Sequence, residues 1–294
     1  MDNEIRLDRE MFGRAVEVAD GFWVAATHHR PGFSKMNPEV NNRALVFRLR
    51  DAETDRPVLL VANGVDPGVI PEVRRLERET GLEVRYVLSV GGGHHLMLPA
   101  WRDEFTKATI LVGPERVPRT PSAQKLMAGG RVRAMNPDNP LPQFAGQLDA
   151  VLFRGLLGVR DKPTPFEGGR EPTLFGVMKM MMSIDDPVDE LWIRHAESGT
   201  VVGGENLGWI LSEKTLKTFP WMMRTVMKAN TVFIQDKFRK VADAEQVAAC
   251  WRRVLAWRGQ ALMGYHEPPG EAFFGDVHGT LAKAVKAVRQ LPHN

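Results

Sequence analysis

The stretch from Val84 to Pro99, V-R-Y-V-L-S-V-G-G-G-H-H-L-M-L-P, constrains the fold more than any other part of the chain. It begins with a β-branched apolar run, continues through consecutive glycines to His94 and His95, and ends at a segment of helical character. This order predicts a buried strand, a bare loop and a helix. Because α/β folds place ligands at the carboxyl ends of buried strands, the two imidazoles are candidate ligands or proton carriers. Alternatively, the glycines only form a tight turn and the histidines are hydrogen-bonded and partly exposed.

Hydrophobic patterning predicts two halves that each run from strands to helices. In the first half we expect helices at 71–80 and 99–106 and strands at 22–26, 44–49, 57–63, 84–88 and 108–113. In the second half we expect helices at 215–229, 243–257 and 279–290 and strands at 150–153, 173–177, 190–195, 199–204 and 260–265. Residues 114–148 form an irregular excursion, with one short helix at 122–127. Two such halves favour two sheets packed face to face with helices outside.

Composition narrows the class of protein. The 39 basic and 36 acidic residues are interspersed and nearly balance, so we expect no nucleic-acid partner. The one cysteine, Cys250, excludes an internal disulfide and a multi-thiolate zinc site, and favours a reducing compartment. The first residues are charged, and no apolar stretch approaches the roughly 20 residues that a membrane span needs. We therefore expect a cytoplasmic protein without a membrane partner.

Several segments together resemble a known fold. They are the strand at 41–49, the histidine loop at 94–99, the segment 189–192 with His195, and His266 at the end of the last strand. Their order resembles the metallo-β-lactamase superfamily over residues 21–291, and is most similar to a bacterial branch of unassigned function. The resemblance implies an α/β, four-layer αβ/βα sandwich, with residues 1–294 forming a single domain.

In that superfamily the loop after the central strand reads H-x-H-x-D-H, followed by G-G-L-P-A-W, and holds a pair of metal ions. Aligning the segment 98–101 with L-P-A-W places His94 on the last histidine of the motif. Ser89, Gly91 and Gly93 then occupy the other motif positions, so these ligands are absent. The resemblance places the next ligand at Asp185 or Asp186, the bridging aspartate at Glu205 and the final histidine on His266.

The resulting candidate metal ligands are His94, His95, Asp186, Glu205 and His266, with His195 as an additional imidazole. Because a pair of ions needs about eight to ten donors including water, this set suits one Zn or Fe ion rather than two. A metal-free site is the alternative, in which His94 or His266 acts as a general base oriented by Glu205 or Asp186. Each residue also has a structural interpretation: Glu205 bonded to backbone amides, His266 in an exposed turn, and Asp185, Asp186 and Asp189 as turn formers.

By analogy with the superfamily, we expect a hydrolase that acts on a small apolar ester, lactone or aryl ether, with His94, His266 and Glu205 as catalytic residues. The alternative is a non-catalytic structural subunit of a homo- or hetero-oligomer that contains an active relative. Loss of motif ligands is what that alternative predicts. In both cases we expect an oligomer.

Overall fold

The computed structural model describes residues 13–29, 40–63, 67–91, 98–115, 127–128, 130–159, 184–203, 209–210, 232–233, 241–265, 267 and 272–286. At some strand ends, Asp186 included, it describes the backbone only. None of the helices in these ranges is long and apolar enough to cross a membrane.

The first half of the chain forms a seven-stranded mixed sheet in sequence order. An antiparallel meander comes first: β1 (Ala15–Ala19), β2 (Phe22–His29), β3 (Val40–Asp51) and β4 (Arg56–Ala62). The sheet continues in parallel from β4 to β5 (Val84–Leu88), β6 (Thr109–Val112) and β7 (Val132–Ala134). The turn η2 (Pro67–Val69) and helix α1 (Ile70–Thr80) connect β4 to β5, and α2 (Leu98–Glu104) lies between β5 and β6. A further turn, η3 (Pro142–Phe144), precedes the second half.

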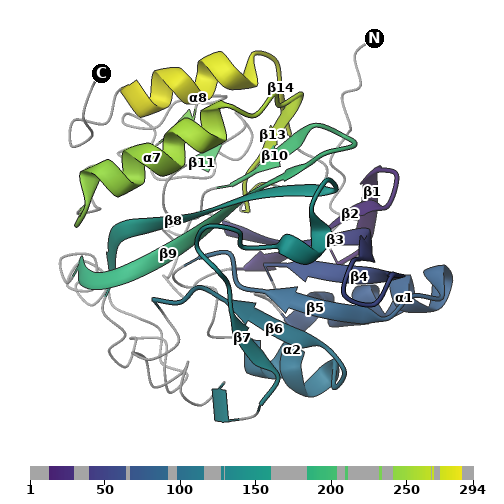
Figure 1. The fold of residues 1–294 in the computed structure, drawn as a ribbon. Helices are drawn as coiled ribbons and strands as arrows, with labels where there is room; N and C mark the ends of the chain where they lie inside the picture. Colours follow the sequence, from purple (N-terminus) through teal and green to yellow (C-terminus); the bar gives the residue numbers. More distant parts are fainter. Residues whose placement is uncertain are drawn as a thin grey trace, which may run out of the picture.

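The second half forms a five-stranded sheet in the order β14-β13-β10-β9-β8. Its long strands are β8 (Leu148–Val159) and β9 (Ile184–His195), and its short ones are β10 (Thr200–Val202), β13 (Ala261–Met263) and β14 (Phe273–Phe274). Helices α7 (Ala244–Leu255) and α8 (Val277–Lys286) cover its outer face (Figure 1). The short strands β11 (Trp209–Ile210) and β12 (Val232–Phe233) pair with each other.

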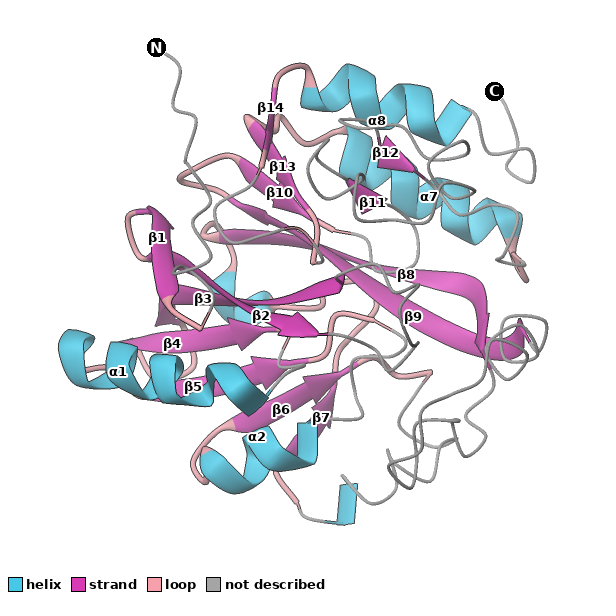
Figure 2. Ribbon diagram, turned by 180° about the vertical axis from the view of Figure 1, so that it is seen from behind, coloured by secondary structure: helices cyan, strands magenta, loops and turns pink. Residues whose placement is uncertain are grey.

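Alternation along the strands separates three apolar layers. On β3, Leu45 and Phe47 point between the sheets, whereas Ala44 and Val46 face α1 and α2. The second sheet repeats the pattern toward α7 and α8. Figure 2 shows the resulting order of helix layer, sheet, sheet and helix layer. The predicted four-layer αβ/βα sandwich is therefore confirmed.

Three predictions about single elements are wrong. β9 begins at Ile184 rather than at residue 190, so the aspartates at 185, 186 and 189 lie within a strand and not in a turn before it. Pro187 obscured this strand in the sequence, but β10 pairs only with Ile193–His195, so a proline is tolerated farther along that edge. β7 lies in the stretch that was expected to be irregular, and β8 is far longer than the predicted 150–153. The predicted elements at 173–177 and 215–229 lie outside the described residues, and of the helix predicted at 122–127 only residue 127 is described.

Candidate active site at one end of the two sheets

Both sheets present strand ends at the same end of the molecule. Two backbone hydrogen bonds join the sheets there: Leu191 N donates to Val90 O at 2.7 Å, and Arg43 N donates to Tyr265 O at 2.9 Å. Within the sheets, Asn63 N donates to Leu88 O at 3.0 Å and Gly203 N donates to Met263 O at 3.1 Å. These bonds therefore hold together the carboxyl ends of β4, β5, β10 and β13 and the start of β3.

The predicted site residues are attached to these strand ends. His94, His95, Glu205 and His266 lie outside the described residues, and of Asp186 only the backbone, within β9, is described. The residues that lead into them, however, are described. Gly91 follows β5, Gly203 follows β10, and Tyr265 and Glu267 flank His266. The structure thus brings the described residues that precede or flank these candidates to one end of the sandwich.

His195 does not share this end. Its ring lies 5.5 Å from that of Phe22 and 5.6 Å from that of Phe47, and its Nδ1 is 3.0 Å from Ser198 Oγ. The six positions from Asp189 to His195 along β9 span about 20 Å, because each strand residue advances roughly 3.3 Å. Burial lowers the pKa of this imidazole, while Glu197 partly opposes the shift. His195 is therefore a core residue at the end of β9 opposite to Asp189.

Arg43 is a fully buried charge at the candidate site, with no exposed surface. Its Nη1 donates to Gly264 O and forms an ion pair with Glu267 Oε2, both at 3.2 Å. Asn63, also fully buried, donates from Nδ2 to Arg43 O at 2.6 Å. Asn63 adopts a left-handed φ of 63°, a conformation that asparagine tolerates better than most residues. Asn63, Arg43 and Glu267, called the polar bridge below, thus connect β4 and β3 to the segment that contains His266.

Asp189 occupies the opposite side of the same end. Its Oδ2 accepts a hydrogen bond from Glu115 N at 2.7 Å, and Glu115 pairs with Arg154 at 3.3 Å. Its carboxylate also lies against Gly113, the residue that follows β6, so closely that a Cβ on Gly113 would be 2.3 Å from Oδ2. Asp189 therefore joins β9 to the exit of β6.

Two of the positions that lack a motif ligand, Ser89 and Gly91, are among the described residues. Ser89 Oγ donates to Gly91 O at 3.4 Å, and Ser89 N donates to Leu111 O at 2.9 Å. Both residues are buried where β5 ends. The serine hydroxyl thus stabilises the beginning of the loop, and Gly91 has no side chain with which to bind an ion.

The described residues at this end do not form a metal site by themselves. Among the described residues no group of three or more His, Cys, Asp or Glu side chains could hold an ion. The described carboxylates of Asp189 and Glu267 are engaged by a backbone amide and by a guanidinium. Any metal site at this end would therefore need donors from outside the described residues.

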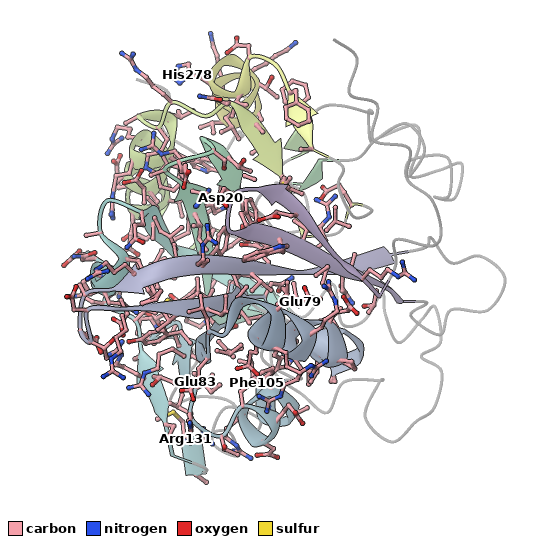
Figure 3. All side chains as sticks on the ribbon, turned by 90° about the vertical axis from the view of Figure 1, so that its right-hand side faces the viewer. Asp20, Glu79, Glu83, Phe105, Arg131 and His278 are labelled. Atoms are coloured by element: carbon pink, nitrogen blue, oxygen red, sulfur yellow. The ribbon has the colours of Figure 1, made fainter. Side chains whose placement is uncertain are left out.

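A hollow of about 400 Å³ lies elsewhere, where α7 ends and α8 begins, lined by residues 255–259 and 275–278. His278 borders it, and its Nδ1 is 2.9 Å from Leu255 O. Figure 3 shows His278 in this outer helical layer, at the far side of the molecule from Arg131 in the α2 region. His278 is exposed in the first turn of α8.

Comparison with known proteins supports the fold and no closer assignment. No family profile and no curated protein sequence matches the chain. A metallo-β-lactamase from Erythrobacter litoralis is 13% identical, with a TM-score of 0.52 over 98% of both chains. The metal-soaked Flv1 flavodiiron core from Synechocystis sp. PCC6803 is 12% identical, with a TM-score of 0.50 over 93% of this chain and 60% of that one. FIM-1 from Pseudomonas aeruginosa, in its mono-zinc form, is 10% identical, with a TM-score of 0.48 over 96% and 99%.

The chain therefore has the metallo-β-lactamase fold, with two mixed sheets between helical layers. The mono-zinc form is a property of the FIM-1 structure.

Sequence reasoning missed the polar bridge and the contact role of Asp189. Arg43 stands between Asn42 and a long apolar run, and a charge at the start of a buried strand is a signal that could have identified it. Asn63 likewise follows the apolar strand β4 directly. The sequence near Arg43 or Asn63 does not indicate which residue each one contacts, because Glu267 lies 224 residues from Arg43 in the sequence.

Proposed function

We propose that this protein is a hydrolase whose active site lies at the end of the sandwich where β5, β10 and β13 exit. The proposed substrates are small and apolar, an ester, a lactone or an aryl ether. His94, His266 and Glu205 are the proposed catalytic residues. The observation that supports this proposal most is the pair of backbone bonds, Leu191 to Val90 and Arg43 to Tyr265, which hold the segments leading to both histidines together.

Each residue has a distinct proposed role. One ion, zinc or iron, would be held by His94 and His266 with a carboxylate from Asp186 or Glu205, and His95 is a further donor. When bound, such an ion polarises the substrate carbonyl or lowers the pKa of a water molecule. Without it, His266 or His94 accepts the proton from the attacking water, and Glu205 or Asp186 orients the imidazole through its other nitrogen.

The test uses metal-defined protein and a panel of aryl esters, lactones and aryl ethers. We expect turnover of at least one substrate class, and a loss of about 100-fold or more in kcat/KM for His94→Ala and His266→Ala, since a positioned acid or base contributes that much. His195→Gln is the matched control, because His195 lies at the other end of β9. Unchanged activity of both alanine variants, with folding intact, would contradict the proposal.

A second function is favoured by Ser89 and Gly91, which occupy positions where the superfamily supplies ligands. A chain that lacks those ligands fits a non-catalytic subunit that stabilises an active relative in a homo- or hetero-oligomer. Sedimentation of the purified chain, alone and with a candidate partner, separates the two functions. Stable association with an active relative, whose rate is unaffected by His94→Ala and His266→Ala in this chain, would favour the subunit over the hydrolase.

A further inference from the structure

The polar bridge has no part in the chemistry proposed above, yet it places a full charge pair inside the protein at the candidate site. Arg43 has no exposed surface, and Glu267 is 4% exposed. Taking two charges out of water is costly, and apolar side chains of similar volume often stabilise a protein as well or better. The stability of the fold alone therefore does not explain why this pair is present.

We infer that Arg43 and Glu267 are positioning residues for His266; this inference rests on the proposed catalytic role of that histidine. Three hydrogen bonds from Arg43 reach the four-residue segment 264–267. The backbone amide holds Tyr265 O at 2.9 Å, and Nη1 holds Gly264 O and Glu267 Oε2 at 3.2 Å each. Arg43 thus bonds to residues on both sides of His266, the carbonyl of Tyr265 before it and the carboxylate of Glu267 after it.

The same bridge relates this segment to the strand that leads to His94. Asn63 donates from Nδ2 to Arg43 O, and its own backbone amide donates to Leu88 O at the end of β5. The relation between the exits of β5 and β13 is therefore set by an unbroken series of short hydrogen bonds. Two catalytic groups on different strands need such a fixed relation, because a displacement of about 1 Å can reduce a rate on the order of 100-fold.

Arginine suits this role better than lysine does. Its planar guanidinium presents several donors in a fixed fork, so it can bond a carbonyl and a carboxylate at once. Gly264 completes the arrangement, because a Cβ at this position would lie 2.4 Å from Glu267 Oε1. A side chain on residue 264 would therefore push the carboxylate away from Arg43.

The first test compares Glu267→Leu, Glu267→Gln and Gly264→Ala on a substrate from the panel. If position matters, Leu and the Gly264→Ala change lower kcat by about 10- to 100-fold with little change in KM, as removal of groups that orient a ligand does. Gln keeps an acceptor for Arg43 Nη1 and restores most of the rate. Replacing the exposed pair Arg50 and Asp55, at the far end of β3, by Met and Ala leaves kcat unchanged. A rate for Glu267→Leu equal to that of the parent would overturn the inference.

The second test does not depend on activity and also covers variants that fold poorly. The double variant Arg43→Met, Glu267→Met removes both charges and keeps apolar volume, so it is expected to unfold cooperatively. In protein with isotope-labelled histidine, the NMR signal of His266 should shift, while those of His195 and His278 stay. An unmoved His266 signal in the folded double variant refutes positioning. A moved signal in a protein that hydrolyses nothing supports positioning and refutes the hydrolase.

Discussion

Gly113 and Asp189 show how one small and one charged residue determine the approach of β6 to β9. The carboxylate of Asp189 fills the space that a side chain on residue 113 would need, and it accepts the amide of Glu115 two residues farther on. Only glycine allows this approach without displacing the carboxylate. The contact lies where the two sheets meet at the candidate active site, so a substitution at Gly113 or Asp189 would change both the packing of the sheets and the site.

Gly113→Ala is expected to destabilise the protein by about 1–3 kcal/mol, the range for adding atoms to a well-packed interior. Urea unfolding of the single variant measures the effect. The single variant Asp189→Ser and the double variant Gly113→Ala, Asp189→Ser complete the comparison. Because the smaller serine relieves the crowding, the losses of stability in the two single variants should sum to more than the loss in the double variant. Strict additivity would show that the carboxylate is not what opposes the methyl group.

His195 should make stability depend on pH. Burial lowers the pKa of its imidazole below the ordinary value of 6.5 in the folded state, so the unfolded chain binds the proton more readily. Its contribution is complete above about pH 6.5 and is lost as the pH falls through that value toward the folded pKa. The urea midpoint of the parent protein should therefore decrease from pH 7.5 to 5.5 more steeply than that of His195→Gln. Parallel decreases in the two proteins would remove His195 as the cause.

Helix α7 is positioned on the second sheet at its first turn as well as along its apolar face. Val247, Trp251 and Val254 are buried against the sheet, and the indole of Trp251 lies 5.0 Å from that of Trp192 on β9. Before the helix, the amides of residues 242 and 243 donate to Gly155 O on β8. Asp243 then caps the helix by accepting from Gln246 N at 3.0 Å.

Asp243→Ala should cost about 1 kcal/mol, the usual loss when an N-cap acceptor is removed. Asp243→Asn keeps an acceptor oxygen and should retain most of the stability. Thermal or urea unfolding of both variants measures the difference. Because α7 covers the sheet on the side away from the candidate site, neither change should alter the rate of a hydrolysed substrate. Equal losses in the two variants would mean that the cap is not the source.

Taken as a whole, the molecule has two halves, each with its own sheet and helices, and the candidate active site lies where their strand exits meet. This arrangement explains why every candidate ligand set combines residues from both halves. The described carboxylates nearest to it, those of Asp189 and Glu267, are bonded to protein groups.

Protein incubated with excess Zn²⁺ or Fe²⁺ and freed of loose ions should retain no more than one ion per chain. The proposed donors, His94, His95 and His266 with a carboxylate from Asp186 or Glu205, would suffice for one tetrahedral centre. Elemental analysis of protein purified without a metal-binding tag measures the ratio. His94→Ala and His266→Ala should each lower it, whereas His278→Gln, in the outer helical layer, should not. Two tightly held ions per chain would contradict the limit.

The sequence alone was enough for the layered architecture, because apolar alternation and helical spacing are local properties of the chain. The strands at 44–49, 57–63 and 84–88 and the helix at 71–80 could all be predicted within a few residues. The long β8–β9 ribbon could not, because Gly155 and Pro187 weaken the local strand pattern and pairing between distant segments compensates for it.

The candidate site divides in the same way. The buried strand β5 that precedes the histidine loop was predictable, since a β-branched apolar run is a local signal. The polar bridge, the contact of Asp189 with Gly113 and the placement of His195 at the opposite end required the tertiary structure. Each depends on which side chains meet across the sheets, and partners far apart in the chain leave no trace in the sequence near either one.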